Sequence, residues 1–237
     1  VVGTQIYNVK ENDFSIKKGP VFANFVLADE INRAPAKVQS ALLEVMQEKQ
    51  VTIGDTTFKL DKPFLVLATQ NPVEQEGTYP LPEAQLDRFM LKILISYPEG
   101  DAEKQMLRNW QSGHYTRFST PLEAVCTEAE IIKCRQFLSH VKVEESLLDY
   151  LVALTNKSRN ISDVSLGASP RAGLAWLAAA KAHAAIEGRD FVTPDNIKFV
   201  AEPVLRHRLI LTAESELDGV TVSQVIANLL RQVPVPR

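Results

Sequence analysis

The chain is poor in cysteine and contains no long apolar run. Cys126 and Cys134 are its two cysteines, and two thiols at this spacing form neither a disulfide framework nor a metal motif. The four histidines are scattered, and none stands at ligand spacing from a cysteine or another histidine, which argues against a structural zinc site. No apolar segment reaches the length of a membrane span, and no signal-peptide pattern is present. We therefore expect a cytoplasmic protein with two ordinary thiols and no membrane span.

An excess of positive charge is also missing. The sequence has 26 Lys and Arg residues against 29 Asp and Glu residues, a formal net charge of −3. This balance argues against bulk binding of nucleic acid or of anionic membranes, which needs a basic face. Apolar residues make up 45% of the 237 residues and charged residues 23%, which excludes disorder over the whole chain. Residues 1–4 (VVGT) include no Met and indicate the middle of a longer sequence.

The first half of the chain predicts a mixture of strands and helices. Residues 22–28 and 64–68 are nearly continuous apolar runs, typical of strands buried on both faces in a parallel sheet that helices cover. Between them, apolar side chains recur at helical spacing over residues 35–48. Residues 51–60 alternate on both sides of a Gly-Asp pair, as β-hairpins do. This order indicates a βαβ unit with an inserted hairpin that projects from it.

From about residue 98 the sequence is almost entirely helical. Thr127 and Glu130 form the pattern of a capping box, which opens a helix. Two further helices begin with a Ser-Pro or Thr-Pro pair, at residues 169–170 and 193–194. We therefore place a boundary within residues 98–125, between an α/β unit and a helical bundle.

Polar residues follow both predicted strands. Asp29 and Glu30 come directly after the first, and Thr69-Gln70-Asn71 follow the second. Parallel strands bring their carboxyl ends to one edge of a sheet. An apolar strand closed by two acids matches the Walker B pattern of P-loop ATPases, in which Asp holds Mg²⁺ near the nucleotide phosphates and Glu polarises the attacking water. A plain strand end with two solvated acids is an equally open interpretation.

Two arginines are the other candidates for chemistry. Arg88 lies in the sequence LDRF, just after a proline-rich loop at residues 79–82. An arginine there can be presented to the γ-phosphate in a neighbouring subunit, but the pattern alone favours a solvated ion pair between Asp87 and Arg88. Arg171 falls in the first turn of a predicted helix, where a cation opposes the helix dipole unless a phosphate binds there. A guanidinium that reaches away to a surface acid explains Arg171 equally well.

The phosphate cradle of a P-loop ATPase is missing. That motif needs a Gly-Lys pair at the end of a glycine-containing loop, and no Gly in these 237 residues is followed by Lys. The cradle is therefore expected upstream of Val1, or the chain is not a working ATPase by itself. A carboxylate metal hydrolase that uses Asp29 and Glu30 without a nucleotide is a weaker alternative, because such sites usually need further His or acidic ligands.

Four segments resemble the MoxR family of AAA+ ATPases, in the order and spacing of that family. They cover nearly the whole chain: LADEINRAPAKVQSALLEVMQEKQVTIG, FLVLATQNPVEQEGTYPLPEAQLDRF, GASPRAG and LRHRLILTAESELDGVTVSQVI. The resemblance implies that Asp29 and Glu30 form Walker B and that Asn71 is the sensor 1 residue. It also implies that Arg88 is an arginine finger and Arg171 the sensor 2 residue.

The resemblance also implies a fold and a division of the chain. The fold is α/β: the C-terminal part of an AAA+ P-loop nucleotide-binding domain, followed by an all-α lid bundle. Residues 1–121 belong to the nucleotide-binding domain, with a hairpin insertion at residues 51–60. Residues 122–237 form the helical lid.

The function that the resemblance implies is ATP hydrolysis by a chaperone-like enzyme that remodels or matures protein complexes. ATP and Mg²⁺ are the expected cofactors, with Asp29 as the metal ligand and Asn71 and Arg171 as nucleotide-binding residues. Glu30, Asn71, Arg88 and Arg171 are the expected catalytic residues, and Arg88 acts on a neighbouring subunit. Expected partners are further copies of the chain in a ring, a hexamer, and a protein with a von Willebrand factor A domain, with no nucleic acid. The alternative is a non-catalytic assembly subunit that lacks a P-loop and donates an arginine finger.

Overall fold

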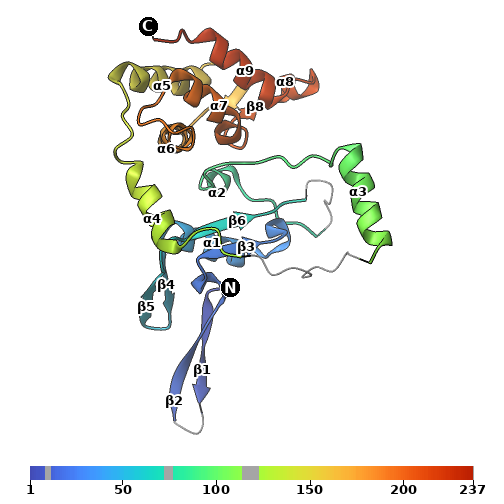
Figure 1. Ribbon diagram of the computed structural model, residues 1–237, viewed down its shortest axis with the longest axis vertical. Helices are drawn as coiled ribbons and strands as arrows, with labels where there is room; N and C mark the ends of the chain where they lie inside the picture. The colour runs from blue at the N-terminus through green and yellow to red at the C-terminus, as the bar shows by residue number, and fades with distance from the viewer. Residues whose placement is uncertain (9–11, 72–76, 114–122, 237) are drawn as a thin grey trace.

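The computed structural model describes residues 1–8, 12–71, 77–113 and 123–236. Within them, the buried apolar side chains form two separate cores, one between residues 21 and 81 and the other between residues 141 and 233. Figure 1 shows the two corresponding bodies one above the other, with the N-terminus in the first and the C-terminus at the far end of the second. Across this described part, no helix combines the length and the apolar character needed to cross a membrane.

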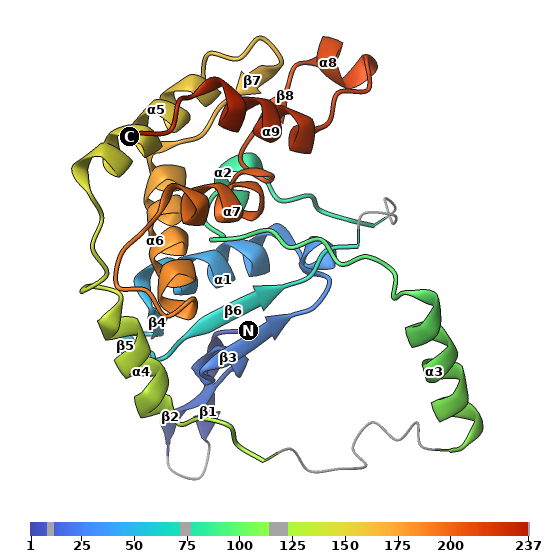
Figure 2. The same cartoon turned by 45° about the horizontal axis from the view of Figure 1, so that its top comes forward.

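The first body is built around a parallel pair of strands. β3 (Phe25–Ala28) and β6 (Leu65–Ala68) pair along their whole length. The connection between them includes α1 (Ala36–Glu48), which lies over one face of the pair (Figure 2). Val26 is buried on that face, in the same core as Leu42 of α1. The predicted parallel βαβ unit is therefore confirmed.

The opposite face of the strand pair is exposed, and here the sequence prediction is wrong. Phe25 and Leu27 of β3, and Leu65 and Leu67 of β6, all present large apolar side chains to solvent. Alternate residues of a strand point to opposite faces, so α1 buries only one set. No element in the described ranges buries the other set, although its composition is that of a covered face.

The predicted hairpin is present and is only partly projecting. β4 (Gln50–Ile53) and β5 (Thr56–Lys59) pair antiparallel around Gly54, whose φ of +60° suits glycine. The two strands form a sheet of their own. Val51 and Ile53 are nevertheless buried in the core of the first body. One face of the hairpin therefore packs inward, and only its outer face and turn project.

A second hairpin, which the sequence analysis did not predict, lies beside the first (Figure 1). It consists of β1 (Gly3–Asn8) and β2 (Asp13–Lys18), paired antiparallel. The two hairpins touch where Gln5 of β1 lies against Gly54, so that a Cβ at Gly54 would come within 2.3 Å of Gln5 Nε2. The positive φ is what favours glycine at this turn, because the Gln5 amide is the end of a flexible side chain and can move aside.

The chain that leaves the first body is poorly packed. α2 (Glu83–Leu86) is a single turn close to the helical body, whereas α3 (Gly100–Gln111) stands apart from both bodies (Figures 1 and 2). α3 has no buried residue. Residues 91–97 have no regular secondary structure, and apolar side chains such as Ile95 and Tyr97 are almost fully exposed. These are further apolar surfaces without a covering layer in the described residues.

The second body is a helical bundle around the fully buried Trp176, whose Nε1 donates to the carbonyl oxygen of Ile197 at 2.7 Å. The predicted helix starts are confirmed: Thr127 and Thr193 form capping boxes, and Ser169 caps its helix. A short antiparallel strand pair joins the bundle. The elements of the bundle are α5 (Glu145–Ser158), β7 (Val164–Leu166), α6 (Pro170–Ile186), α7 (Pro194–Leu205), β8 (Ile210–Leu211), α8 (Ala213–Leu217) and α9 (Val222–Gln232). α4 (Glu128–Phe137) has no buried residue and lies beside the β4–β5 end of the first body (Figures 1 and 2).

The two bodies meet next to α2. The backbone N–H of Lys92 donates to the carbonyl oxygen of Pro203 in α7 at 2.8 Å. Side-chain hydrogen bonds from Ser169 and Arg208 to the Asp87 carboxylate cross the same junction. The predicted boundary between residues 121 and 122 lies outside the described residues. That division of the chain stays a prediction.

Candidate functional site

The carboxyl ends of β3 and β6 carry the predicted acids. Because Ala28 pairs with Ala68, the next residues, Asp29 and Thr69, meet at the edge of the sheet. The Thr69 hydroxyl donates to Asp29 Oδ1 at 2.5 Å and accepts from the backbone N–H of Glu30 at 2.8 Å. Parallel pairing thus brings both acids and the residues after β6 to one edge.

Glu30 has a left-handed backbone, with φ 50° and ψ 50°. A residue with a Cβ rarely adopts this conformation, which costs on the order of 1 kcal/mol and clusters at functional sites. Two hydrogen bonds to Thr69 hold the backbone of Glu30 in this conformation. The Thr69 hydroxyl accepts from the N–H of Glu30, and the Thr69 carbonyl oxygen accepts from the N–H of Ile31 at 3.0 Å. The Glu30 carboxylate forms an ion pair with Arg33 Nε at 3.1 Å, and about half of each side chain is exposed.

A buried glutamine of α1 holds the loops beside these acids. Gln39 Nε2 donates to the carbonyl oxygens of Ile31 at 3.1 Å and of Tyr79 at 2.8 Å. The N–H of Tyr79 donates to the carbonyl oxygen of Asn32 at 2.6 Å, and Asn32 Nδ2 reaches the carbonyl oxygen of Asn71 at 3.5 Å. The predicted sensor residue Asn71 is therefore tied through its backbone to the turn after Glu30, and it is itself exposed.

Asp87 pairs with the helical body and not with Arg88. Arg208 Nε donates to Asp87 Oδ1 at 2.7 Å, and Ser169 Oγ donates to Asp87 Oδ2 at 2.9 Å. The ion pair between Asp87 and Arg88 that the local pattern favoured is therefore wrong. Arg88 is half-buried, its Nε has no hydrogen-bond partner in the described ranges, and no acid there forms an ion pair with it.

Arg171 is the second residue of α6, at a helix start that the bundle holds firmly. The preceding Ala168 donates its N–H to Ser158 Oγ at 3.0 Å, and its carbonyl oxygen accepts from Arg159 Nε at 2.8 Å. Ser169 then caps the helix. Arg171 is exposed, and within the described part of the chain no acid forms an ion pair with it. The alternative in which a surface acid binds Arg171 is therefore not what the structure shows.

The candidate residues fall into two groups. Asp29, Glu30 and Asn71 gather at the edge of the sheet and present oxygen atoms. Arg88 and Arg171 lie at the junction between the bodies, each within two residues of the hydrogen bond that joins Asp87 to the start of α6. The first group can bind a metal ion and accept a proton, and the second group can bind an anion.

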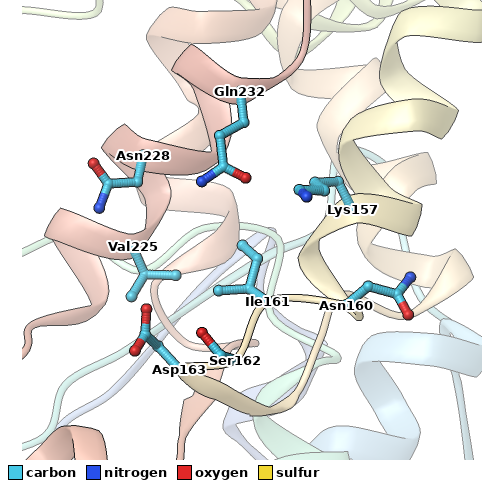
Figure 3. A pocket seen from close by; sticks show the side chains of 8 residues that line it. All are labelled: Lys157, Asn160, Ile161, Ser162, Asp163, Val225, Asn228 and Gln232. Atoms are coloured by element: carbon cyan, nitrogen blue, oxygen red, sulfur yellow. The ribbon is translucent and has the colours of Figure 1, made fainter.

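A pocket of about 170 Å³ lies elsewhere, in the helical body (Figure 3). Polar side chains from the end of α5 and from α9 face it across a short loop. It is smaller than the roughly 300 Å³ at which ligand pockets usually begin. It contains none of the predicted site residues; its lining is Lys157, Asn160, Ile161, Ser162, Asp163, Val225, Asn228 and Gln232.

Asp29 fits the chemistry of a magnesium ligand. Mg²⁺ prefers oxygen ligands and is commonly held by one or two carboxylates together with the phosphates of a substrate. Asp29 is exposed, and its Oδ2 remains available because Thr69 binds Oδ1. The described residues contain no group of three or more His, Cys, Asp or Glu side chains that could hold a metal alone. A metal at Asp29 would therefore need phosphate oxygens, and the metal-hydrolase alternative lacks a ligand set there.

Sequence reasoning missed the residues that position the site. The signal at Thr69 is a hydroxyl directly after a strand of the parallel pair, where it can bind the residues that follow the neighbouring strand. Gln39 gave a signal as a polar residue on the apolar side of a helix, and it is 2% exposed. Arg208 lies in the quoted segment LRHRL, but nothing local shows that it pairs with Asp87, more than a hundred residues away.

Known proteins resemble the chain over its whole length. Residues 1–91 match the family described as "ATPase family associated with various cellular activities (AAA)", and residues 156–229 match the AAA lid domain. Chaperone MoxR1 of Mycobacterium tuberculosis is 44% identical over 100% of this chain and 64% of its own length. Uncharacterized protein YeaC of Bacillus subtilis is 42% identical over 100% of this chain and 73% of its own. A crystal structure of a proposed ATPase from Cytophaga hutchinsonii matches with a TM-score of 0.90 and 47% identity, over 100% of this chain and 73% of that one.

Proposed function

The chain belongs to the MoxR family of AAA+ ATPases, and from that membership we propose that the protein hydrolyses ATP to remodel or mature protein complexes. The observation that carries the proposal is the edge where β3 and β6 end. There an Asp and a Glu follow one strand directly, and a Thr after the neighbouring strand binds both residues. A solvated strand end would not need this arrangement or the left-handed backbone of Glu30.

At this edge each residue has a proposed task. Glu30 orients the attacking water and accepts its proton, because a half-exposed carboxylate on a fixed turn can act as a general base. Asn71 helps to orient the same water. Asp29 would hold Mg²⁺, which when bound to ATP neutralises charge on the phosphates.

The two arginines supply positive charge toward the γ-phosphate. Arg171 does so from the N-terminus of α6 in the same subunit, where the helix dipole adds to its attraction for an anion. Arg88 does so in the neighbouring subunit. In the described part of the chain neither guanidinium is neutralised by an acid, so their charge is available to an anion.

The phosphate cradle lies, in this proposal, on a segment outside these 237 residues. Within the described residues β6 pairs with β3 alone, so one side of β6 is open to a further strand. A parallel strand there would end beside Asn71, at the edge where ligands of open α/β sheets bind. The exposed face of Leu27 and Leu67, and the exposed residues 91–97, are apolar surfaces that such a segment would cover. The chain spans 64% of the length of Chaperone MoxR1, which leaves room for it.

Assembly and partners belong to the same proposal. Copies of the protein form a homo-oligomeric ring in this proposal, because Arg88 must reach the site of a neighbour, and the family resemblance implies that the ring is a hexamer. A protein with a von Willebrand factor A domain is the proposed partner, and the proposed location is cytoplasmic.

The test is Glu30→Gln in the longer protein that carries the cradle. The amide keeps the size of the side chain but cannot accept a proton, so ATP affinity should be nearly unchanged while turnover falls roughly 10²- to 10⁴-fold. Nucleotide binding by calorimetry and phosphate release measure the two quantities. Glu44→Gln, on the exposed side of α1, is the matched control and should change neither.

Two outcomes contradict this assignment. Equal losses of ATP binding and turnover in Glu30→Gln would show that the carboxylate holds the nucleotide instead. A longer protein that binds no ATP before any substitution would favour the non-catalytic assembly subunit.

A further inference from the structure

Arg208 is 5% exposed and lies at the junction between the two bodies, whereas arginine is almost never fully buried unless it is paired. Its guanidinium uses all five of its N–H donors. Nε donates to Asp87 Oδ1 at 2.7 Å, Nη1 donates to the carbonyl oxygens of Val204 and Met90, and Nη2 donates to the carbonyl oxygens of Asp87 and Phe89. Four of these bonds end on the segment that carries the predicted arginine finger.

Other residues of the helical body hold the same segment. The second oxygen of Asp87 accepts from Ser169 Oγ at 2.9 Å, so one carboxylate joins Arg208 to the start of α6. His207 Nε2 donates to the carbonyl oxygen of Phe89 at 3.0 Å, and the N–H of Lys92 donates to α7. The residues on both sides of Arg88 are therefore fixed to the helical body.

The ion pair between Arg208 and Asp87 determines position more than it adds stability. Burial lowers the pKa of Arg208, the hydrogen bond and charge of Asp87 act in the opposite direction, and the charge of Arg171 lowers it further. Desolvation of two charges generally offsets most of their attraction. A planar guanidinium, however, fixes the directions of several acceptors at once, which an ammonium group cannot do.

Resting on the proposed role of Arg88 as an arginine finger, we propose that Arg208 is a positioning residue for that finger. Arg208 binds the carbonyl oxygens on either side of Arg88 and holds this segment against the helical body. The helical body of one subunit then carries the finger that acts in the next subunit, and a movement of the body moves the finger.

The experiment is a double-mutant cycle in the longer protein that carries the phosphate cradle. Arg208→Lys keeps the charge but has fewer donors and no planar fork, so turnover should fall roughly tenfold or more while ATP affinity stays near that of the unmodified protein. If Arg208 acts through Arg88, the double variant Arg88→Ala/Arg208→Lys should be no slower than Arg88→Ala alone. Arg206→Lys is the matched control. Arg206 lies two residues away, directly after the end of α7, and forms its ion pair with Glu202 of that same helix at 2.6 Å.

A second readout does not depend on ATPase activity. Hydrogen exchange at the backbone amides of Arg88, Phe89 and Lys92 should quicken roughly tenfold in Arg208→Lys and stay unchanged in Arg206→Lys. If Arg208→Lys does not fold, Asp87→Asn weakens the same pair from the other side and carries the same expectations.

The outcomes separate this inference from the proposed function. Unchanged exchange at the three amides overturns the positioning role, and so do additive losses of turnover in the double variant. If exchange quickens but Arg88→Ala turns over ATP normally, the proposed finger itself is what fails, and the positioning role fails with it. Faster exchange together with a non-additive loss supports both.

Discussion

The two bodies of the molecule differ in how completely they bury apolar side chains. In the helical body, Trp176, Leu154 and Ile197 are fully buried among helices of the same chain. In the first body, α1 covers one face of β3 and β6, while the other face exposes Leu27 and Leu67. Burial of apolar surface is the main favourable term in folding, at about 25 cal/mol per Å². The helical body therefore obtains its stability from its own residues. The first body lacks the stabilisation that burial of its exposed strand face would add.

The same difference appears in the chemistry. The first body carries the carboxylates, on turns that Thr69 and Gln39 hold rigidly. The helical body carries Arg171 and anchors the segment of Arg88. In the proposed mechanism the oxygen atoms and the cations of the site come from different bodies and different subunits. Such a site would be complete only after assembly, which provides a way to couple catalysis to movement. The predictions below test this division, beginning with the largest expected effect.

The first prediction is that Arg88 acts outside its own subunit. In the longer protein, Arg88→Ala should leave ATP affinity nearly unchanged and lower turnover on the order of 10³-fold or more, as loss of an arginine finger does. Mixing this variant with Glu30→Gln should restore part of the activity. In mixed rings, some sites combine an intact Glu30 from one variant with an intact Arg88 from the other. Phosphate release measured against mixing ratio checks both statements.

Two results would separate the parts of that prediction. Turnover near that of the unmodified protein in Arg88→Ala would remove its catalytic role. A large loss of turnover without recovery on mixing would place Arg88 in the site of its own subunit. The carboxylates and the cations would then come from two bodies of one subunit and not from different subunits.

The second prediction compares one substitution in both bodies. Leu154→Ala removes a side chain that is 0% exposed and should lower the free energy of unfolding of the 237-residue chain by about 2–5 kcal/mol. Leu27→Ala removes a side chain that is 66% exposed and should cost less than about 0.5 kcal/mol. Urea unfolding measures both. In the longer protein the cost of Leu27→Ala should rise toward that of Leu154→Ala. If Leu27→Ala instead costs equally little in the 237-residue chain and in the longer protein, no segment covers this face of the strands.

Local patterns were sufficient to predict most of the fold. The start of α6 at Ser169 and Pro170, and the turn of the β4–β5 hairpin at Gly54, follow from short-range chemistry that the sequence displays directly. The open face of β3 could not be predicted in this way, because the composition of Leu27 and its neighbours reflects a covering layer that the described residues do not contain. The hairpin of β1 and β2 was missed since its strands bury little, with Tyr7 and Phe14 both exposed.

The candidate site, too, has parts that local motifs predict and parts that only long-range contacts determine. Asp29 and Glu30 were found because a motif of consecutive residues marks them, and parallel pairing then predicts their closeness to the residues after β6. The partner of Asp87 was predicted wrongly because the local choice, Arg88, is one residue away, while Arg208 comes close only after the two bodies have packed together. Long-range pairing of this kind depends on tertiary structure, which helix caps and strand alternation do not specify.

The last prediction concerns the junction itself. His207 is buried there, and burial lowers its pKa to about 4 from 6.5; the charges of Arg208 and Lys92 act in the same direction, and the carbonyl of Phe89 and the charge of Asp87 oppose it. Between these two pH values the unfolded chain binds more protons at this residue than the folded chain, so the free energy of unfolding falls as the pH is lowered. From pH 7 to pH 5 the loss from this residue should be about 2 kcal/mol.

The measurement is urea unfolding of the unmodified protein and of His207→Gln at several pH values between 7 and 5. The glutamine can still donate to the carbonyl of Phe89 but does not titrate, so the stability of the variant should fall less steeply, by about 2 kcal/mol over this interval. Parallel curves for the unmodified protein and His207→Gln would mean that His207 is hydrated in solution. In that case the two bodies separate at the contacts that fix the segment of Arg88, because His207 is buried by the same junction.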